Sequence, residues 1–176
     1  MNIRVLDPST RRVTAWSGGK TTELFLYPFD GSYAERRFNI RISSATVDLP
    51  ESSFTRLDGV TRYLTPLSEG FYLKRGGRWI YLPHGDVLCF SGEEDILCRA
   101  SGRDLNLMLK GARGEMRFLP KGDHVLTLHT FLFLCCPEET NVNGTVLPAD
   151  SFAEITSAGF STLRLSRPAV LFSADI

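Results

Sequence analysis

The sequence predicts an all-β protein built from two similar halves, each a small β-barrel. Its apolar segments are short, alternate in polarity or are rich in β-branched and aromatic residues, and helical periodicity is hard to find. Gly, Pro, Asn and Asp turns close these segments about every 8 to 12 residues. The order also repeats, because YLPHGD at 81–86 and VLPAD at 146–150 each follow a strand, a turn and a strand. The alternative is a single irregular sandwich with the second half as its lid.

The composition is that of a globular protein with no strong charge bias. A chain of 176 residues, 43% hydrophobic and 23% charged, fits one domain or two closely packed halves. Lys+Arg and Asp+Glu both number 20, which leaves no basic stripe for a phosphate backbone and excludes nucleic acid as the expected partner. No segment is apolar over the length of a signal peptide or a membrane span, so we expect a cytoplasmic protein without membrane association.

The cysteines and histidines do not form metal-site patterns. The cysteines lack zinc-site spacing, and an adjacent pair cannot easily form an unstrained disulfide, so all are expected to be thiols: Cys89, Cys98, Cys135 and Cys136. His84, His124 and His129 recur at no metal-ligand spacing. The sequence therefore predicts neither a metal nor another cofactor.

The strands can be assigned in order from their turns. In the first half they are residues 3–6, 12–16, 21–28, 38–47, 62–67, 71–74, 79–82, 87–90, 96–100 and 104–109. Pro8 and the two glycines at 18–19 punctuate the first three, and Gly76–Gly77 is a two-residue hairpin turn.

Residues 110–115 are interpreted as the boundary between the halves. Strands are then expected at 125–128, 130–136 and 145–155, with a tight turn at Asn143–Gly144. The predicted units are a first barrel at 1–114 and a second, smaller half at 115–176 packed on it, with exchange of strands between them allowed.

The strand at 38–47 carries a guanidinium on a face that a closed sheet would bury. Alternation places Phe38, Ile40 and Ile42 on one face and the small or polar residues on the other: Asn39, Arg41, Ser43 and Ala45. Arg41 then needs a protein carboxylate, backbone carbonyls or an anionic ligand as its partner. Arg62 supplies a second cation. Both suit a small carboxylate, and both could instead pair internally with Glu23, Asp58 or Asp104.

Two further segments have the residue types of a binding site. WSGGKTTE at 16–23 combines an indole, two glycines, hydroxyls and a carboxylate, although a hairpin turn before an ordinary Thr-rich strand explains it equally. DLNLM at 104–108 places Asp104, Asn106 and Met108 on one face, which either completes a pocket or forms an exposed edge. No nucleophile-elbow, phosphate-loop or cysteine–base motif is present, so binding is favoured over catalysis and enzymatic activity stays open.

Taken together, these segments resemble the HutD/Ves family in order and spacing. They are WSGGKTTE at 16–23, RISSA at 41–45, Phe54 with GVTR at 59–62, FSG at 90–92 and DLNLM at 104–108. The resemblance implies a cupin-like (RmlC-like) double barrel, or bicupin, with jelly-roll halves and a metal-free pocket. It also implies a link to histidine utilisation, as a regulator that senses a pathway acid such as urocanate or formylglutamate.

The chain departs from the family pattern in two places. Ser17 stands where the family usually has Asn, and Lys20 follows where a third glycine is common. The usual Phe-Pro-Gly turn is replaced by residues 57–59, and the usual Gly before Phe-Ser is Ser53. The general pocket therefore carries over better than the identity of its ligand.

The expected function is binding of a small carboxylate metabolite. The expected ligand-binding residues are Trp16, Gly18, Gly19, Thr21, Thr22, Glu23, Arg41, Ser43, Arg62, Asp104 and Asn106. Arg41 and Arg62 would hold the anion, and Trp16 would form a wall. The alternatives are an isomerase or hydrolase with Glu23 or Asp104 as general base, and a protein-interaction module. A homodimer is the favoured assembly.

Overall fold

The described residues fold mainly into β-strands joined by turns and loops, which confirms the predicted all-β class. The computed structural model describes residues 1–16, 18–47 and 49–176. A short 3₁₀ helix lies at Pro8–Thr10. The strands are β1 (Asn2–Val5), β2 (Arg12–Trp16), β3 (Gly19–Tyr27), β4 (Ile40–Val47), β5 (Ser52–Ser53), β6 (Val60–Pro66), β7 (Phe71–Arg75), β8 (Arg78–Leu82), β9 (Leu88–Ser91), β10 (Leu97–Arg99), β11 (Gly102–Lys110), β12 (Arg113–Leu119), β13 (Gly122–Leu126), β14 (Phe131–Cys136), β15 (Thr140–Val142), β16 (Thr145–Leu147), β17 (Ser151–Thr156), β18 (Ser161–Leu165) and β19 (Ala169–Asp175).

The strands belong to two compact units. The first comprises Thr10–Ala112, and the second comprises Met1–Ser9 with Arg113–Ile176. The N-terminal residues belong to the second unit because β1 pairs antiparallel with β17, from Asn2 opposite Thr156 to Val5 opposite Ala153. The sequence predicts instead a first barrel at 1–114 that includes these residues.

The Thr10–Ala112 unit consists of two antiparallel sheets around a shared core. One sheet has the order β2-β3-β4-β11-β6-β9, with β4 and β11 at its centre, and the other has the order β5-β10-β7-β8. Their buried side chains meet in one cluster, which includes Val47 of β4, Leu64 of β6, Phe71 and Leu73 of β7, and Cys98 of β10. The two-sheet arrangement is the jelly-roll form of a cupin unit, and the sheets do not close into a continuous barrel.

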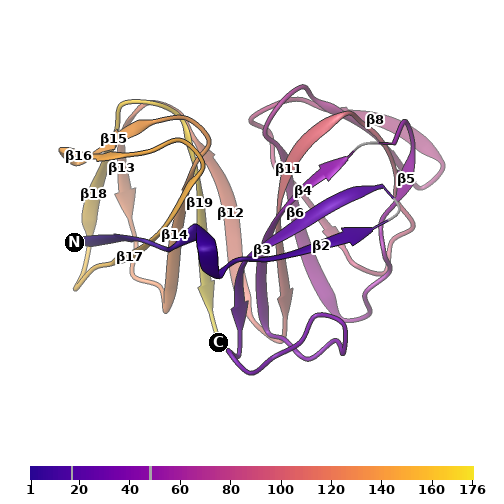
Figure 1. The fold of residues 1–176 in the computed structure, drawn as a ribbon, viewed down its shortest axis with the longest axis horizontal. Coiled ribbons are helices and arrows are strands. Elements are labelled where there is room, and N and C mark those ends of the chain that lie inside the picture. The colour runs from indigo at the N-terminus through magenta and orange to yellow at the C-terminus, as the bar shows by residue number, and fades with distance from the viewer. Residues whose placement is uncertain (17, 48) are drawn as a thin grey trace. The chain divides into compact units, whose positions relative to one another are not determined.

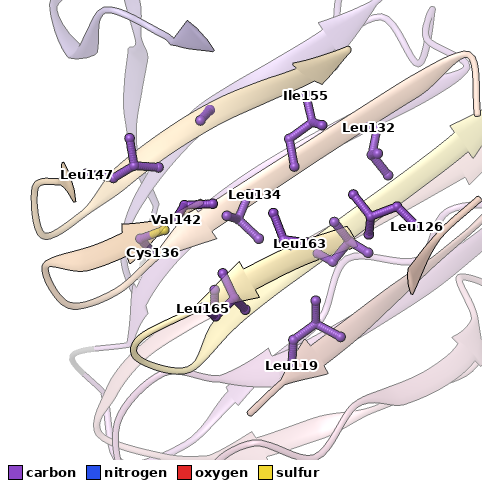
Figure 2. Close-up of a cluster of buried hydrophobic side chains, with 13 residues drawn as sticks. Leu119, Leu126, Leu132, Leu134, Cys136, Val142, Leu147, Ile155, Leu163 and Leu165 are labelled. Atoms are coloured by element: carbon purple, nitrogen blue, oxygen red, sulfur yellow. The ribbon is translucent and has the colours of Figure 1, made fainter. Parts of the chain in front are cut away.

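The second unit repeats the two-sheet plan. Its sheets have the orders β1-β17-β14-β19-β12 and β13-β18-β15-β16, and the strands of the larger one lie side by side in Figure 1. Figure 2 shows their shared core, in which Leu134 of β14 lies among leucines from both sheets. Burial of these aliphatic side chains stabilises the unit without a disulfide, and all four cysteines of the chain are thiols, as predicted.

Four strands of this unit were not predicted: β12, β15, β18 and β19. β12 begins inside the expected boundary at 110–115, and β18 and β19 follow the last expected strand. In β19, Ala169 to Ala174 are buried without a break, so the alternation that marks a half-exposed strand is missing. β13 is Gly122–Leu126, so it contains the first two residues of the strand expected at 125–128 and begins three residues earlier. No helix in the described part of the chain is long and apolar enough to cross a membrane.

Candidate functional site

The three central strands of the larger sheet in the Thr10–Ala112 unit present one polar face. Met108 of β11 lies opposite Arg41 of β4 on one side and Arg62 of β6 on the other. Directly opposed residues of antiparallel strands share a face, so both arginines lie on the same side of the sheet. Asn106 opposite Ser43, and Asp104 opposite Ala45, extend this face along β11.

This face lines a pocket of about 180 Å³. An apolar cavity of about 150 Å³ holds benzene, so the space suits a ligand with about one small ring or fewer atoms. Its walls come from β2, β3, β4, β5, β6, β11 and two connecting segments. The lining residues are Thr14, Trp16, Thr21, Tyr33, Arg41, Ser43, Ala45, Val47, Ser53, Phe54, Thr55, Arg62, Asp104, Asn106 and Met108.

Arg41 has a protein carboxylate as its partner. Its side chain is almost inaccessible, and its Nε donates to Glu23 Oε2 at 3.1 Å. Nη1 donates to Ser43 Oγ at 3.2 Å, and the guanidinium lies 3.9 Å from the centroid of the Tyr33 ring. The charge of Arg41 is therefore compensated within the protein, one of the outcomes that the sequence left open.

Arg62 lacks such compensation. It is 5% exposed, and its Nη2 and Nη1 donate to neutral acceptors, Asn106 Oδ1 at 3.2 Å and the Thr55 carbonyl at 3.3 Å. Its Nε has no hydrogen-bond partner, and no carboxylate of a described residue lies within ion-pair distance. The guanidinium also lies over the rings of Phe54 and Phe90 at 5.0 and 5.1 Å. Burial lowers the pKa of Arg62 to about 10, so it remains charged at neutral pH.

Asp104 is a buried carboxyl in the same wall. It is 2% exposed, and its Oδ1 accepts hydrogen bonds from the Ala45 N–H at 3.2 Å and Asn106 Nδ2 at 2.8 Å. Burial raises the pKa of Asp104 to about 7, against the pull of these hydrogen bonds and of Arg62. Asp104 therefore changes charge near neutral pH.

We expect Asp104→Asn to remove a pH dependence of stability. The pKa of Asp104 is higher in the folded protein, about 7, than the usual value of 3.8, so the folded protein holds a proton that the unfolded chain has released. Stability should then be full below about pH 4 and fall as pH rises to about 7, by up to about 1.4 kcal/mol per pH unit. Urea denaturation at four pH values across this window measures the difference between the two proteins. If the free energy of unfolding changed with pH equally in the two proteins, folding would not raise the pKa of Asp104.

Seven of the predicted site residues line the pocket: Trp16, Thr21, Arg41, Ser43, Arg62, Asp104 and Asn106. Glu23 reaches the site through its ion pair with Arg41. Thr22 does not line the pocket, because it pairs with Ser44, which points to the opposite face from Ser43. The predicted departure at Ser17 lies outside the described residues.

The two predicted glycines, Gly18 and Gly19, lie where β2 turns into β3, next to the pocket residue Trp16. A Cβ on Gly18 would overlap the Trp16 ring at 2.1 Å, and one on Gly19 would lie 2.0 Å from the Thr46 carbonyl oxygen. Gly19 also has a φ of 152°, which side chains disfavour. These glycines therefore let the β2–β3 hairpin lie close to the end of β4 and let the Trp16 ring pack.

Gly19→Ala is expected to lower the free energy of unfolding by about 1–3 kcal/mol, because the new methyl group meets backbone and not a movable side chain. Hydrogen exchange of the backbone amides measures the loss in the unit that carries each substitution. Gly159→Ala is the matched control, since no atom lies within 4 Å of its Cβ position. Equal stability of the two variants would show that the hairpin relaxes around the methyl group.

Sequence reasoning did not include several of the lining residues among the site residues. Ala45 was placed on the Arg41 face but not among the site residues, and Val47 continues the same alternation. Tyr33 lies in the connection between β3 and β4, and its contact with Arg41 has no pattern in the sequence. In the described part of the chain, no group of three His, Cys, Asp or Glu residues could hold a metal ion.

Two jelly-roll units, with a polar pocket on the inner face of one, define a two-unit protein of the cupin class. The HutD family model matches residues 9–169, and the chain belongs to this family. No curated protein matches the chain.

Solved structures share the whole fold at low sequence identity. HutD from Pseudomonas fluorescens SBW25, in a formate condition, is 20% identical, with a TM-score of 0.81 over 99% of this chain and 98% of that one. The conserved protein PA5104 of unknown function from Pseudomonas aeruginosa PAO1 is 22% identical, with a TM-score of 0.78 over 100% of both chains. Ylba from E. coli is 10% identical, with a TM-score of 0.65 over 99% of this chain and 91% of that one. At such identities these likenesses establish the fold alone.

Proposed function

We propose that this protein binds a small carboxylate in the pocket of its Thr10–Ala112 unit and acts as a metabolite sensor. The observation that carries the proposal is Arg62, a buried guanidinium with neutral acceptors and an unpartnered Nε. A buried cation with no carboxylate in direct contact is costly. A carboxylate bound there would supply an ion-pair partner in contact with Arg62 and the missing hydrogen-bond acceptor.

The other lining residues complete a site for a flat acid. The Ser43 and Thr21 hydroxyls can hydrogen-bond a ligand oxygen. Trp16 contributes an indole whose Nε1 is buried without a hydrogen-bond partner, and therefore offers a second unused donor. Tyr33 and Phe54 add aromatic walls. Polar groups that converge beside aromatic walls fix the orientation of a ligand in small-molecule sites.

The biological setting is part of the proposal. Membership of the HutD family supports a role in histidine utilisation, in which the sensed acid would be urocanate or formylglutamate. The thiol state of all four cysteines fits the cytoplasm, and we retain a homodimer as the expected assembly.

An enzyme using the same pocket is the second candidate. The observation in its favour is Asp104, whose pKa of about 7 suits a general acid or base at neutral pH. Incubation of the protein with each acid, followed by NMR of the mixture, separates the two functions. Binding without conversion supports a sensor, whereas turnover that Asp104→Asn abolishes supports an enzyme.

The test is calorimetric titration of metal-stripped protein with urocanate, formylglutamate, histidine and formate. We expect one of the acids to bind at micromolar strength, about −8 kcal/mol, and Arg62→Met to weaken it by about 10- to 150-fold, the value of a charged hydrogen bond. Arg62→Met is preferred to Arg41→Ala because it leaves no protein carboxylate unpaired. Arg99→Met is the matched control, since this exposed arginine stacks on Trp79 outside the pocket. Equal affinity of Arg62→Met and the parent would contradict the proposal.

A further inference from the structure

The two oxygens of Asp104 have different surroundings. Oδ1 accepts both of the hydrogen bonds that the carboxyl receives, from the Ala45 N–H and Asn106 Nδ2. Oδ2 accepts none from the described residues, although Asp104 lines the pocket. A proton on Oδ1 would face two N–H donors, so a protonated Asp104 carries its proton on Oδ2.

The charges around Asp104 balance only while the pocket is empty. Arg62 on β6 and Arg41 on β4 are the cations, and Glu23 on β3 is the second anion, already paired with Arg41. Two positive and two negative groups sum to zero when Asp104 is ionised. A bound carboxylate would then add an uncompensated negative charge next to Asp104, and closely placed carboxylates share a proton.

No other group near Asp104 can take up this charge at neutral pH. Tyr33, on the β3–β4 connection, lines the pocket with its ring against the Arg41 guanidinium. The Cys98 thiol on β10 interacts with Asp104, and burial raises the pKa of that thiol to about 12, so it is neutral. Glu23 is engaged by the Arg41 Nε–H at 3.1 Å. Asp104 is therefore the group that changes its protonation state when a carboxylate binds.

We propose that a carboxylate ligand enters this pocket together with one proton from solvent, and that Asp104 Oδ2 holds that proton in the complex. This inference rests on the proposed carboxylate site and adds its regulation by pH. Uptake of the proton restores a net charge of zero around the ligand, and the neutral carboxyl becomes a hydrogen-bond donor inside the pocket.

The sign of the pH effect follows from linkage. The free protein has already bound the proton below the pKa of Asp104, near 7, so affinity is constant there. The ligand's negative charge raises the pKa of Asp104 further. Between the two pKa values, each unit of pH weakens binding by about tenfold. Acidification through neutral pH therefore strengthens capture of the acid.

The test uses formate, which has no group that titrates between pH 6 and 8. Trp79→Phe leaves Trp16 as the one tryptophan, because the chain contains 2, and makes its fluorescence a reporter of the pocket. Formate is titrated at pH 6, 7 and 8 against sodium chloride at equal ionic strength, in this background with and without Asp104→Asn. Calorimetry in two buffers of different ionisation enthalpy counts the protons taken up.

We expect formate to bind about tenfold more weakly at pH 8 than at pH 6, with uptake of half to one proton per formate at pH 8. Asp104→Asn resembles the protonated acid in shape. In this variant the dissociation constant of formate should change less than twofold between pH 6 and pH 8, and proton uptake should vanish. The parent's pH profile and proton count test the inference even if the variant fails to fold.

The failures are distinguishable. Formate binding that Arg62→Met abolishes, but that shows a flat pH profile and no proton uptake, would overturn this inference and leave the carboxylate site intact. No response to formate or urocanate, in either protein at any of these pH values, would overturn the proposed function and this inference with it.

Discussion

Replacing Glu23 with Gln is expected to lower the free energy of unfolding by about 3–5 kcal/mol. The change leaves Arg41, which is 4% exposed, without its carboxylate partner. Its remaining contacts, with Ser43 Oγ and the Tyr33 ring, are to neutral groups. The desolvation of the guanidinium is then no longer offset by an ion pair.

Urea denaturation followed by tryptophan fluorescence measures this loss, because both tryptophans lie in the Thr10–Ala112 unit. Glu35→Gln, in the same unit, is the matched control. Its ion pair with Arg37 has a similar length, 3.0 Å, but lies at the surface, so we expect a loss below about 1 kcal/mol. Similar losses in the two variants would mean that Arg41 reaches water or another anion when Glu23 is removed.

The second large effect is expected in the other unit, where Leu134→Ala should cost about 2–5 kcal/mol. Leu134 is fully buried at the centre of the cluster in Figure 2, with leucines of both sheets around it. Removing the three carbons beyond Cβ loses their transfer free energy and leaves a cavity among the neighbouring strands.

Hydrogen exchange of the backbone amides measures this change, because neither tryptophan lies in the second unit. The protection free energy of amides in β14, β17 and β19 should fall by the full loss of stability, about 2–5 kcal/mol. Val146→Ala, at a side chain that is 57% exposed, should stay within about 0.5 kcal/mol of the parent. A small effect of Leu134→Ala would show that the core collapses onto the vacant space.

The polar face of the site was predictable where a single strand determines it. Arg41 and Ser43 alternate with buried isoleucines in β4, and Asp104 and Asn106 alternate with leucines in β11, so each pair had to share a face. The pairing of β4 with β11 and of β11 with β6 then places the two arginines on the same face of the sheet. No local sequence pattern specifies that pairing. Here the family resemblance supplied what periodicity could not.

The partner of Arg41 depends on an irregularity that the sequence does not reveal. The pairing of β3 with β4 shifts by one residue between Glu23 and Phe25, so Glu23 lies opposite Ser43 whereas Leu26 lies opposite Arg41. A bulge of this kind turns the strand and changes which residues share a face. Thr22 was predicted together with Thr21 for its hydroxyl, but neighbouring residues of a strand point to opposite faces, and it is Thr21 that lines the pocket.

The most direct measurement is a crystal structure of the protein with formate or urocanate bound. The account predicts the carboxylate in the pocket of the Thr10–Ala112 unit, with an oxygen about 2.7–2.9 Å from a guanidinium nitrogen of Arg62. An acid bound elsewhere on the chain, with Arg62 still hydrogen-bonded only to Asn106 and Thr55 in an otherwise unliganded pocket, would contradict it.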